Sequence, residues 1–385
     1  MAKHRATVAE IDLSAIRHNL KAIRSLLAPK VKIMAVVKAD GYGHGAVPCA
    51  KAALEAGADW LGVAILEEGI ELRENGVSAP ILVMGGIFPN EVADLIRHDL
   101  STSVSTLPLA ESLSQEAEKQ GKTVGVHLKV DTGMGRLGMH PEDLLAFVEK
   151  IQYSNNLRIE GIFTHLSSSD EGDPEFTQFQ FSRLVDALTP LKAKGISLPL
   201  IHTANSAAIL MFPDSHLNMV RPGIILYGAL PSPDLKPTIN ALKAHDVQFR
   251  PVMRWKTKII QINKVPKGTP LSYNRQFITE RVSLIATLPV GYGDGLNRAL
   301  SNNMDVLIRG QRAPQVGVIC MDLCLIDVTN IEGVQCEDEV VLFGQQGEAT
   351  ITVDEMAEQC GTISYEILCN VSKRVPRVYL TNGKL

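Results

Sequence analysis

The hydrophobic pattern of the chain changes period repeatedly up to about residue 230. Short apolar runs rich in β-branched residues alternate with stretches in which apolar residues recur at the spacing of one helix face. The predicted strands are 31–37, 61–64, 81–84, 101–104, 124–130, 159–164, 200–203 and 218–220. The predicted helices are 15–27, 46–56, 67–75, 90–97, 107–120, 142–151 and 174–194. Eight strands with helices between them over about this length are typical of a (β/α)8 barrel.

The pattern changes at a proline-rich connector, residues 231–237, in which few positions can join a helix. Beyond it the predicted strands are 251–265, 282–288, 306–309, 315–320, 323–328 and 340–343, and only 353–360 reads as a helix. We therefore expect an α/β protein with a barrel domain at 12–237 and a mostly β C-terminal domain at 238–385. Residues 1–11 include a strand-like run, 7–11, that can pair with either domain, so these residues are left open as a possible part of the second one.

Composition narrows the functional classes. The net charge is −4, from 38 Lys and Arg against 42 Asp and Glu, so no basic excess favours a nucleic-acid partner. No apolar run approaches the roughly 20 residues that span a bilayer, and the start of the sequence lacks a signal-type apolar core. The 6 cysteines form no C-x-x-C pair. A cytoplasmic protein with reduced thiols and no membrane or nucleic-acid partner is expected.

The end of the first barrel strand is the first candidate site. There the sequence reads VKADGYGHG (residues 37–45). A lysine directly after a buried strand is partly desolvated, which lowers its pKa and frees the amine of Lys38 to form a Schiff base with a carbonyl compound. A lysine reaching to solvent is the simpler interpretation, but the interleaved glycines let backbone approach a ligand closely.

The fifth strand places three ionisable side chains on one face. Alternation puts His127, Lys129 and Asp131 toward the barrel interior, where an unpaired cation is costly. Lys129 can be neutralised by an ion pair with Asp131 or by carbamylation of its amine, and the sequence does not separate these alternatives.

The last three strands end in further polar groups, namely His165, the segment His202 to Ser206, and Arg221 to Ile224. Late-strand loops that end in glycine and a helix start are where barrels often bind phosphate through backbone N–H groups. Because the carboxyl ends of all eight strands meet at one face, these groups are expected to converge.

Several of these segments together resemble the alanine racemase family, whose enzymes depend on pyridoxal 5'-phosphate. The matching motifs are VVKADGYGHG (36–45), DTGMGR (131–136), ANS (204–206), RPG (221–223), LSY (271–273), VGYGDG (290–295), CMD (320–322), YE (365–366) and RVPR (374–377). They cover nearly the whole chain in order. The resemblance implies a barrel and a β-domain in a head-to-tail homodimer with shared active sites, which interconverts L- and D-alanine for peptidoglycan.

The resemblance also assigns the two catalytic bases. Lys38 would hold the cofactor covalently and then act as one base, and Tyr273 of the other subunit would act on the opposite face. A phenol with a pKa near 10 needs about 4 kcal/mol of help to work near neutrality, and a hydrogen-bonded chain through His165 to Arg221 is the implied source. Asn274 follows Tyr273 where the family pattern has glycine, which leaves the loop geometry open.

The remaining roles follow the same motifs. Arg221 would face the pyridine nitrogen, and because a guanidinium only donates hydrogen bonds, that nitrogen stays unprotonated. This disfavours transamination, whereas a carboxylate there would favour a decarboxylase-like design. The phosphate would be held by Tyr42, Ser206, Gly223, Ile224 and Tyr365. Arg136, oriented by a carbamylated Lys129, would reach the cofactor and the substrate carboxylate, with Met321 and Asp322 beside the substrate.

Other functions are considered with these residues. A decarboxylase of the same fold is the main alternative, and Arg221 speaks against it. A metal-dependent barrel hydrolase using His127, Lys129, His165 and His202 would leave Lys38 without a role, so no metal is expected. A non-catalytic cofactor carrier would be expected to lack the second domain.

Overall fold

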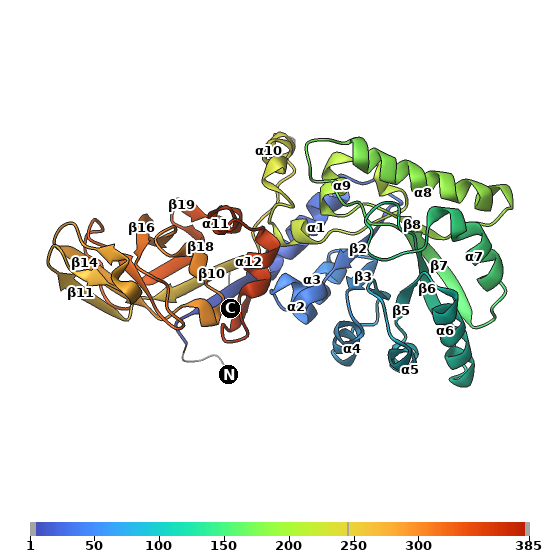
Figure 1. The fold of residues 1–385 in the computed structure, drawn as a ribbon, viewed down its shortest axis with the longest axis horizontal. Coiled ribbons are helices and arrows are strands. Elements are labelled where there is room, and N and C mark those ends of the chain that lie inside the picture. The colour runs from blue at the N-terminus through green and yellow to red at the C-terminus, as the bar shows by residue number, and fades with distance from the viewer. Residues whose placement is uncertain (1–4, 245, 382–385) are drawn as a thin grey trace.

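The computed structural model describes residues 5–244 and 246–381, which form two adjoining domains (Figure 1). The first is built on a sheet of eight strands in the order β8-β7-β6-β5-β4-β3-β2-β9, all paired in parallel. Its strands are β2 (Lys32–Val36), β3 (Trp60–Val63), β4 (Ile81–Val83), β5 (Ser101–Val104), β6 (Val124–Lys129), β7 (Leu157–Phe163), β8 (Leu200–His202) and β9 (Met219–Val220). At the seam between β8 and β9, the backbone N–H of Arg221 donates to the carbonyl of Ala204 at 2.9 Å. The predicted barrel is confirmed.

Helices surround this sheet (Figure 1). They are α1 (Leu13–Ser25), α2 (Lys38–Tyr42), α3 (Ala46–Glu55), α4 (Leu66–Glu74), α5 (Val92–Arg97), α6 (Leu107–Lys119), α7 (Leu144–Ile151), α8 (Glu175–Ala193) and α9 (Ser206–Met211). Their apolar stripes bury residues such as Ile16, Leu20 and Ile23 of α1 against the barrel. The strands of the barrel are buried on both faces, so the side chains at their carboxyl ends are the ones that reach an opening.

The second domain is mostly β, as predicted. Its main sheet has the order β11-β14-β17-β16-β15-β18-β10-β1-β20, with β19 paired to β18, and β12 and β13 form a separate hairpin. The strands are β10 (Met253–Lys258), β11 (Gln261–Val265), β12 (Pro270–Leu271), β13 (Phe277–Ile278), β14 (Ser283–Leu288), β15 (Asp305–Ile308), β16 (Gln311–Val316), β17 (Cys324–Asp327), β18 (Glu339–Gln346), β19 (Ala349–Ile351) and β20 (Arg377–Leu380).

Both ends of the described chain are joined in this second sheet. β1 (Val8–Asp12) pairs with β10 antiparallel and with β20 parallel, so the chain starts in the β-domain before it enters the barrel. Asp12, the last residue of β1, caps α1 by accepting from the backbone N–H of Ser14 at 2.8 Å. The side chain of Asp12 therefore caps α1 at the point where the chain passes from the β-domain into the barrel.

Four α-helices were not predicted: α2 and α9 in the barrel domain, and two further along the chain. The proline-rich connector leads into α10 (Lys236–Lys243), because Pro237 lies in the first turn, where no intrahelical donor is needed. In the β-domain α11 (Val353–Cys360) is followed by α12 (Ser364–Asn370), which the sequence pattern did not reveal. The helix α12 packs against α2 (Figure 1). This packing brings Tyr365 beside residues of the barrel.

No helix in residues 5–244 and 246–381 is long and apolar enough to cross a membrane. Over the same ranges no group of three or more His, Cys, Asp or Glu side chains is arranged to hold a metal ion.

Candidate active site

The carboxyl end of β2 turns sharply to present Lys38. The chain enters the short α2 with Ala39 and Asp40 at a φ of 52° and Gly41 at 61°, a left-handed turn that costs free energy for residues with a side chain. The turn is held from both sides. The carboxylate of Glu68 accepts from the N–H of Ala39 at 2.5 Å, and that of Asp40 accepts from the N–H of Ala46 at 2.8 Å.

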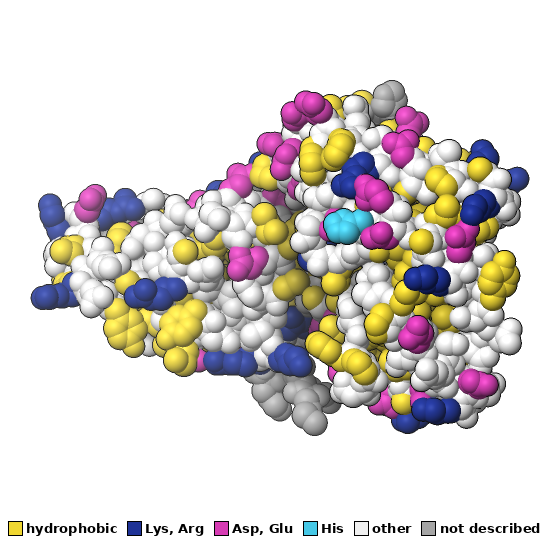
Figure 2. Space-filling model, turned by 45° about the vertical axis from the view of Figure 1, so that its right-hand side comes forward, with side chains coloured by type: hydrophobic (Ala, Val, Ile, Leu, Met, Phe, Trp, Pro, Cys, Tyr) yellow, Lys and Arg dark blue, Asp and Glu magenta, His cyan; other side chains and the backbone are white. Residues whose placement is uncertain are grey.

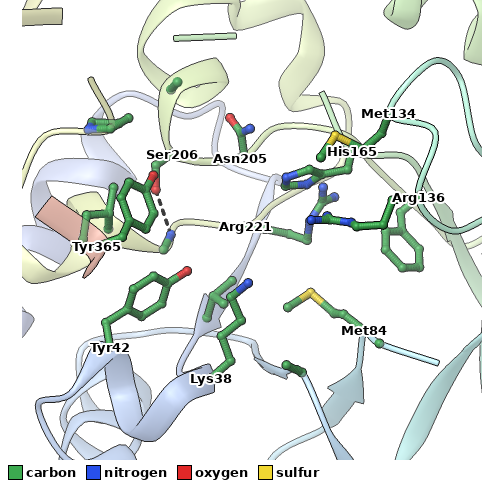
Figure 3. A pocket seen from close by; sticks show the side chains of 18 of the residues that line it. Lys38, Tyr42, Met84, Met134, Arg136, His165, Asn205, Ser206, Arg221 and Tyr365 are labelled. Carbon is green, nitrogen blue, oxygen red and sulfur yellow. Dashed lines mark hydrogen bonds between the residues drawn. The ribbon is translucent and has the colours of Figure 1, made fainter. Parts of the chain in front are cut away.

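The amine of Lys38 points into a cavity of about 360 Å³ at the barrel mouth (Figure 3). Burial, and secondarily the positive charge of Arg136, lower the pKa of Lys38 below its ordinary value. In the described part of the chain no hydrogen bond or ion pair engages its Nζ atom. A larger fraction of this amine is therefore unprotonated than in a surface lysine, and it is available for reaction.

Ten of the predicted residues line this one cavity. They are Lys38, Tyr42, Lys129, Arg136, His165, Ser206, Arg221, Gly223, Ile224 and Tyr365. Nine come from the barrel and one, Tyr365, from α12 of the second domain. The cavity is also lined by Met84, Phe163 and Asp170, which sequence reasoning did not single out. Phe163 could have been found, since it ends the strand before His165.

Arg221 is buried in the floor of the cavity, with 4 % of its surface exposed. Its two terminal nitrogens donate four hydrogen bonds, to His202 Nδ1 (2.9 Å), His202 O (2.8 Å), Thr164 O (2.8 Å) and Thr203 O (3.1 Å). A guanidinium has five N–H groups, so the Nε–H is the donor left over within the described structure. Burial lowers the pKa of Arg221 to about 9, which still leaves it charged at neutral pH.

The opposite end of the cavity is rich in uncharged donors. The hydroxyls of Tyr42 and Tyr365 and the side chain of Ser206 face the same space (Figure 3). The N–H of Gly223 donates to Ser206 Oγ at 2.9 Å, and a Cβ at position 223 would come within 2.4 Å of the Tyr42 hydroxyl. Burial raises the pKa of both tyrosines, so they stay protonated as donors.

Lys129 and Asp131 do not share the environment that alternation predicted. Lys129 is buried, with its amine 4.4 Å from the ring centre of Phe163. Burial, followed by the charges of Arg221 and Arg136, holds the pKa of Lys129 well below its usual value. Asp131 lies beyond the end of β6, where its Oδ1 accepts from Gly133 N (2.9 Å) and Gly135 N (3.1 Å). The carboxylate shapes the 131–136 turn and does not pair with the lysine.

His165 lines the cavity beside Arg136 (Figure 3). Burial and the charge of Arg221 lower the pKa of His165 well below its ordinary value, so its ring is neutral. The backbone carbonyl of His165 accepts from Gln180 at 3.1 Å. The hydrogen-bond partners of the Arg221 guanidinium are His202, Thr164 and Thr203. The predicted hydrogen bond between the His165 ring and Arg221 is therefore not found within the described residues.

Three predicted residues lie outside this cavity, on the β-domain. Tyr273 is 65 % exposed and Met321 is 52 % exposed, and Asp322 is held by Arg374 at 2.7 Å. The backbone around Tyr273 is left-handed at Ser272 (φ 61°) and Asn274 (φ 57°). Asparagine tolerates this conformation better than most side chains, so the loop keeps the turn that a glycine would allow.

The donor set of the cavity fits pyridoxal 5'-phosphate. Hydroxyls and backbone N–H groups at one end suit a phosphate dianion, because they donate without a counter-charge. The glycine at 223 leaves room that any side chain would fill. The free amine of Lys38 suits an aldehyde, and the remaining N–H of Arg221 suits a ring nitrogen that accepts. Fold and site thus define the class of a cofactor-binding barrel enzyme with a second, β-rich domain.

Comparison with known proteins identifies the family. The alanine racemase N-terminal domain model matches residues 11–231, and the C-terminal domain model matches residues 252–379. The alanine racemase of Halothermothrix orenii is 48% identical over 375 residues, covering 97% of each chain. That of Methanococcus maripaludis is 46% identical over 373 residues, covering 97% of this chain and 98% of the relative. The chain belongs to the alanine racemase family, as its motifs indicated, and this family depends on pyridoxal 5'-phosphate.

Solved structures agree over the full length. The alanine racemase of Bacillus anthracis with bound L-Ala-P has a TM-score of 0.91 at 36% identity and covers 100% of this chain and 97% of its own. The alanine racemase of Clostridium difficile 630 in complex with cycloserine has a TM-score of 0.90 at 38% identity, covering 99% and 97%. These coverages include the β-domain as well as the barrel.

Proposed function

We propose that this protein is an isomerase that interconverts L-alanine and D-alanine with pyridoxal 5'-phosphate. The observation that carries the proposal is the convergence of ten residues from separate motifs on one cavity, with the unpaired amine of Lys38 facing it. The decarboxylase alternative is not favoured, because the full-length relatives are alanine racemases and the pocket floor is a guanidinium.

The cofactor would be held at both ends of the cavity. Tyr42, Ser206, Tyr365 and the backbone of Gly223 and Ile224 would donate to its phosphate, and Lys38 would bind its aldehyde carbon. The Nε–H of Arg221 would donate to the ring nitrogen. When bound, the cofactor supplies a conjugated system that makes the α-hydrogen of an amino acid acidic.

Racemisation needs one proton-transferring group on each face of the α-carbon. Lys38 Nζ, with its lowered pKa, is suited to take or return a proton on one side. Tyr273 Oη is proposed as the group on the other side. Because Tyr273 lies on an exposed loop outside the cavity of its own chain, it would have to come from a second subunit.

The same reasoning supports a homodimer with shared active sites. Exposed apolar side chains of the β-domain include Tyr273, Tyr292, Met321 and Leu323, and hydrophobic groups are visible on the surface of this domain in Figure 2. A partner's cavity would cover them and receive Met321 and Asp322 beside the substrate carboxylate. A head-to-tail dimer closes this exchange with two equal contacts.

Lys129 is proposed to be carbamylated. A buried amine with a lowered pKa and no carboxylate partner can react with carbon dioxide, and the resulting anion would orient the neighbouring guanidinium of Arg136 toward the cofactor and substrate. Carbamylation of Lys129 would raise the mass of the intact protein by that of one carbon dioxide.

Domain limits and cellular role complete the proposal. The division into 12–237 and 238–385 is supported by the strands, since β2 to β9 build the barrel and β10 onward the second sheet, with α10 across the boundary. We further propose a cytoplasmic enzyme that supplies D-alanine for peptidoglycan. The six free cysteines agree with the reducing conditions of the cytoplasm.

One experiment tests the central proposal. Purified protein loaded with pyridoxal 5'-phosphate is reduced with borohydride and digested, and L-alanine is converted in parallel. We expect the label on the peptide containing Lys38 and equal final amounts of both enantiomers. Release of carbon dioxide from alanine, or no turnover with the label on another lysine, would refute the assignment.

A further inference from the structure

Two buried histidines fill the barrel core directly beneath Arg221. His202 ends β8 and His127 lies in the middle of β6, and neither is exposed to solvent. His202 Nδ1 is 2.9 Å from Arg221 Nη1, and His202 Nε2 is 2.9 Å from His127 Nδ1. On the far side, His127 Nε2 lies 3.9 Å from Glu160 Oε2. The row of side chains therefore runs from the active-site floor toward the opposite mouth of the barrel.

The chemistry of Arg221 fixes the proton on each ring. A guanidinium can only donate, so His202 Nδ1 must accept and its single proton sits on Nε2. His202 Nε2–H then donates to His127 Nδ1, which places the proton of His127 on Nε2. Both rings are neutral by this reasoning alone. Burial, and secondarily the charge of Arg221, also lower the pKa of both histidines.

The row of side chains runs from a cation, Arg221, to an anion, Glu160. Both ring N–H groups lie on the side away from Arg221, and the last nitrogen, His127 Nε2, lies 3.9 Å from a carboxylate oxygen of Glu160. That carboxylate accepts from Ser101 Oγ at 2.5 Å and from Arg158 Nη2 at 2.6 Å. Aligned N–H dipoles between opposite charges reinforce one another in a low-dielectric core. The His127 Nε2–H is buried without a hydrogen-bond partner in the described structure, so Glu160 supplies its electrostatic counterpart.

Aromatic rings hold the two histidines in place. Phe163 stacks on His202 with the ring centres 4.8 Å apart and the planes at 3°, and Trp60 meets His127 edge-on at 5.2 Å. Rotation of either imidazole would break these contacts as well as the hydrogen bonds.

We propose that His202 and His127 are positioning residues that hold Arg221 through a directed hydrogen-bond chain, which ends at His127 and faces the carboxylate of Glu160 across 3.9 Å. By engaging one Nη1–H, His202 prevents the guanidinium from turning its terminal N–H groups into the cavity and leaves the Nε–H as its donor there. The effect on turnover rests on the proposed function, whereas the proton positions do not.

Nuclear magnetic resonance of protein labelled with 15N-histidine tests the proton positions directly. The resonances are assigned from His202→Gln and His127→Gln, and both wild-type rings are expected as neutral Nε2–H tautomers without added cofactor. A proton on Nδ1 or a cationic ring at neutral pH would overturn the proposal. Glu160→Gln, at the partly exposed end, should keep the fold and shift mainly the His127 Nε2–H signal, and an unchanged signal would argue against an interaction between His127 and Glu160.

A matched pair of variants separates positioning from packing. His202→Leu removes the acceptor for Arg221, and His202→Gln can still accept and donate. His216→Leu is the control, because His216 is also buried and hydrogen-bonded, to Ile209 O at 3.0 Å, but lies outside the chain. We expect His202→Leu to lower kcat/KM with alanine about 10- to 100-fold, His202→Gln to recover most of this, and His216→Leu to change only the melting temperature.

Equal kcat/KM for His202→Leu and His216→Leu would show that His202 serves packing alone. If His202→Leu does not fold, the Glu160→Gln spectrum still decides the matter. Failure of the wild type to racemise alanine would reject the proposed function and leave the tautomer result standing.

Discussion

The two sides of the candidate site differ in how much of their geometry one chain can set. On the barrel side, Lys38 and Arg221 are placed by strand ends, a braced turn and a buried hydrogen-bond network. On the β-domain side, Tyr273 and Met321 stand on exposed loops, more than half open to solvent. The difference indicates that one chain by itself can place the residues proposed to bind the cofactor, whereas the proposed second base would need another surface to complete the site.

Removing the amine on the barrel side should have the largest effect. Lys38→Ala deletes both the covalent anchor and one proton carrier, so racemisation should fall on the order of 10^4-fold or more. Borohydride reduction followed by mass spectrometry should then find no cofactor on the 36–45 peptide. Retention of more than a small fraction of the activity would contradict the assignment. Lys51→Ala, on the exposed side of α3, is the control.

Changing the β-domain side should have a smaller and asymmetric effect. Tyr273→Phe keeps the ring and removes the hydroxyl, so exchange of the α-proton should slow by about 10²- to 10⁴-fold, mainly for one enantiomer. Proton exchange from each enantiomer in deuterated water, followed by mass spectrometry, gives the two rates. The variant should still bind cofactor through Lys38.

Mixing the two impaired variants sharpens the comparison. If the site is shared, a hybrid of Lys38→Ala and Tyr273→Phe subunits has one intact site and activity returns after joint refolding or co-expression. If each chain supplies its own tyrosine, the mixture stays inactive, and the dimer proposal fails.

Acid should lower the stability of the barrel domain because His44 is buried there as a neutral ring. Its Nδ1 donates to Gly41 O (3.0 Å) and Tyr42 O (2.9 Å), and its buried Nε2 has no partner within the described residues. Burial lowers the pKa of His44 to about 4 from 6.5. The unfolded chain therefore binds a proton first as the pH falls, so stability is fully present above pH 6.5 and declines toward pH 4, by about 3 kcal/mol from this residue.

Urea unfolding at several pH values between 7 and 4 measures that loss. His44→Gln should flatten part of the slope, because the amide does not titrate. A free energy of unfolding that is constant over this range in the wild type would contradict the buried neutral ring.

The smallest expected effect lies at the junction of the two regions. Asp12→Ala removes the carboxylate that caps α1 and should lower the free energy of unfolding by about 1 kcal/mol. Asp12→Asn, which can still accept from Ser14 N–H, should lose much less. Thermal or urea denaturation measures both, and equal losses would mean that the charge and not the cap matters.

The sequence by itself determined the barrel, the β-rich second domain and the ten residues that meet in the cavity. Period changes between strand and helix define parallel sheets, and parallel sheets bring all strand ends to one face. Local signals failed at α10 and α12, where a first-turn proline and a short helix without clear periodicity left little to detect.

Only the tertiary structure decided which polar groups meet. It paired β1 with the last strand, moved Asp131 away from Lys129 and brought Tyr365 across from the second domain. It also revealed the row from Arg221 through His202 and His127 to Glu160, whose members lie on four different strands or strand ends. Hydrogen bonds depend on positions to within a few tenths of an ångström, and residues distant along the chain acquire such positions only when the barrel closes.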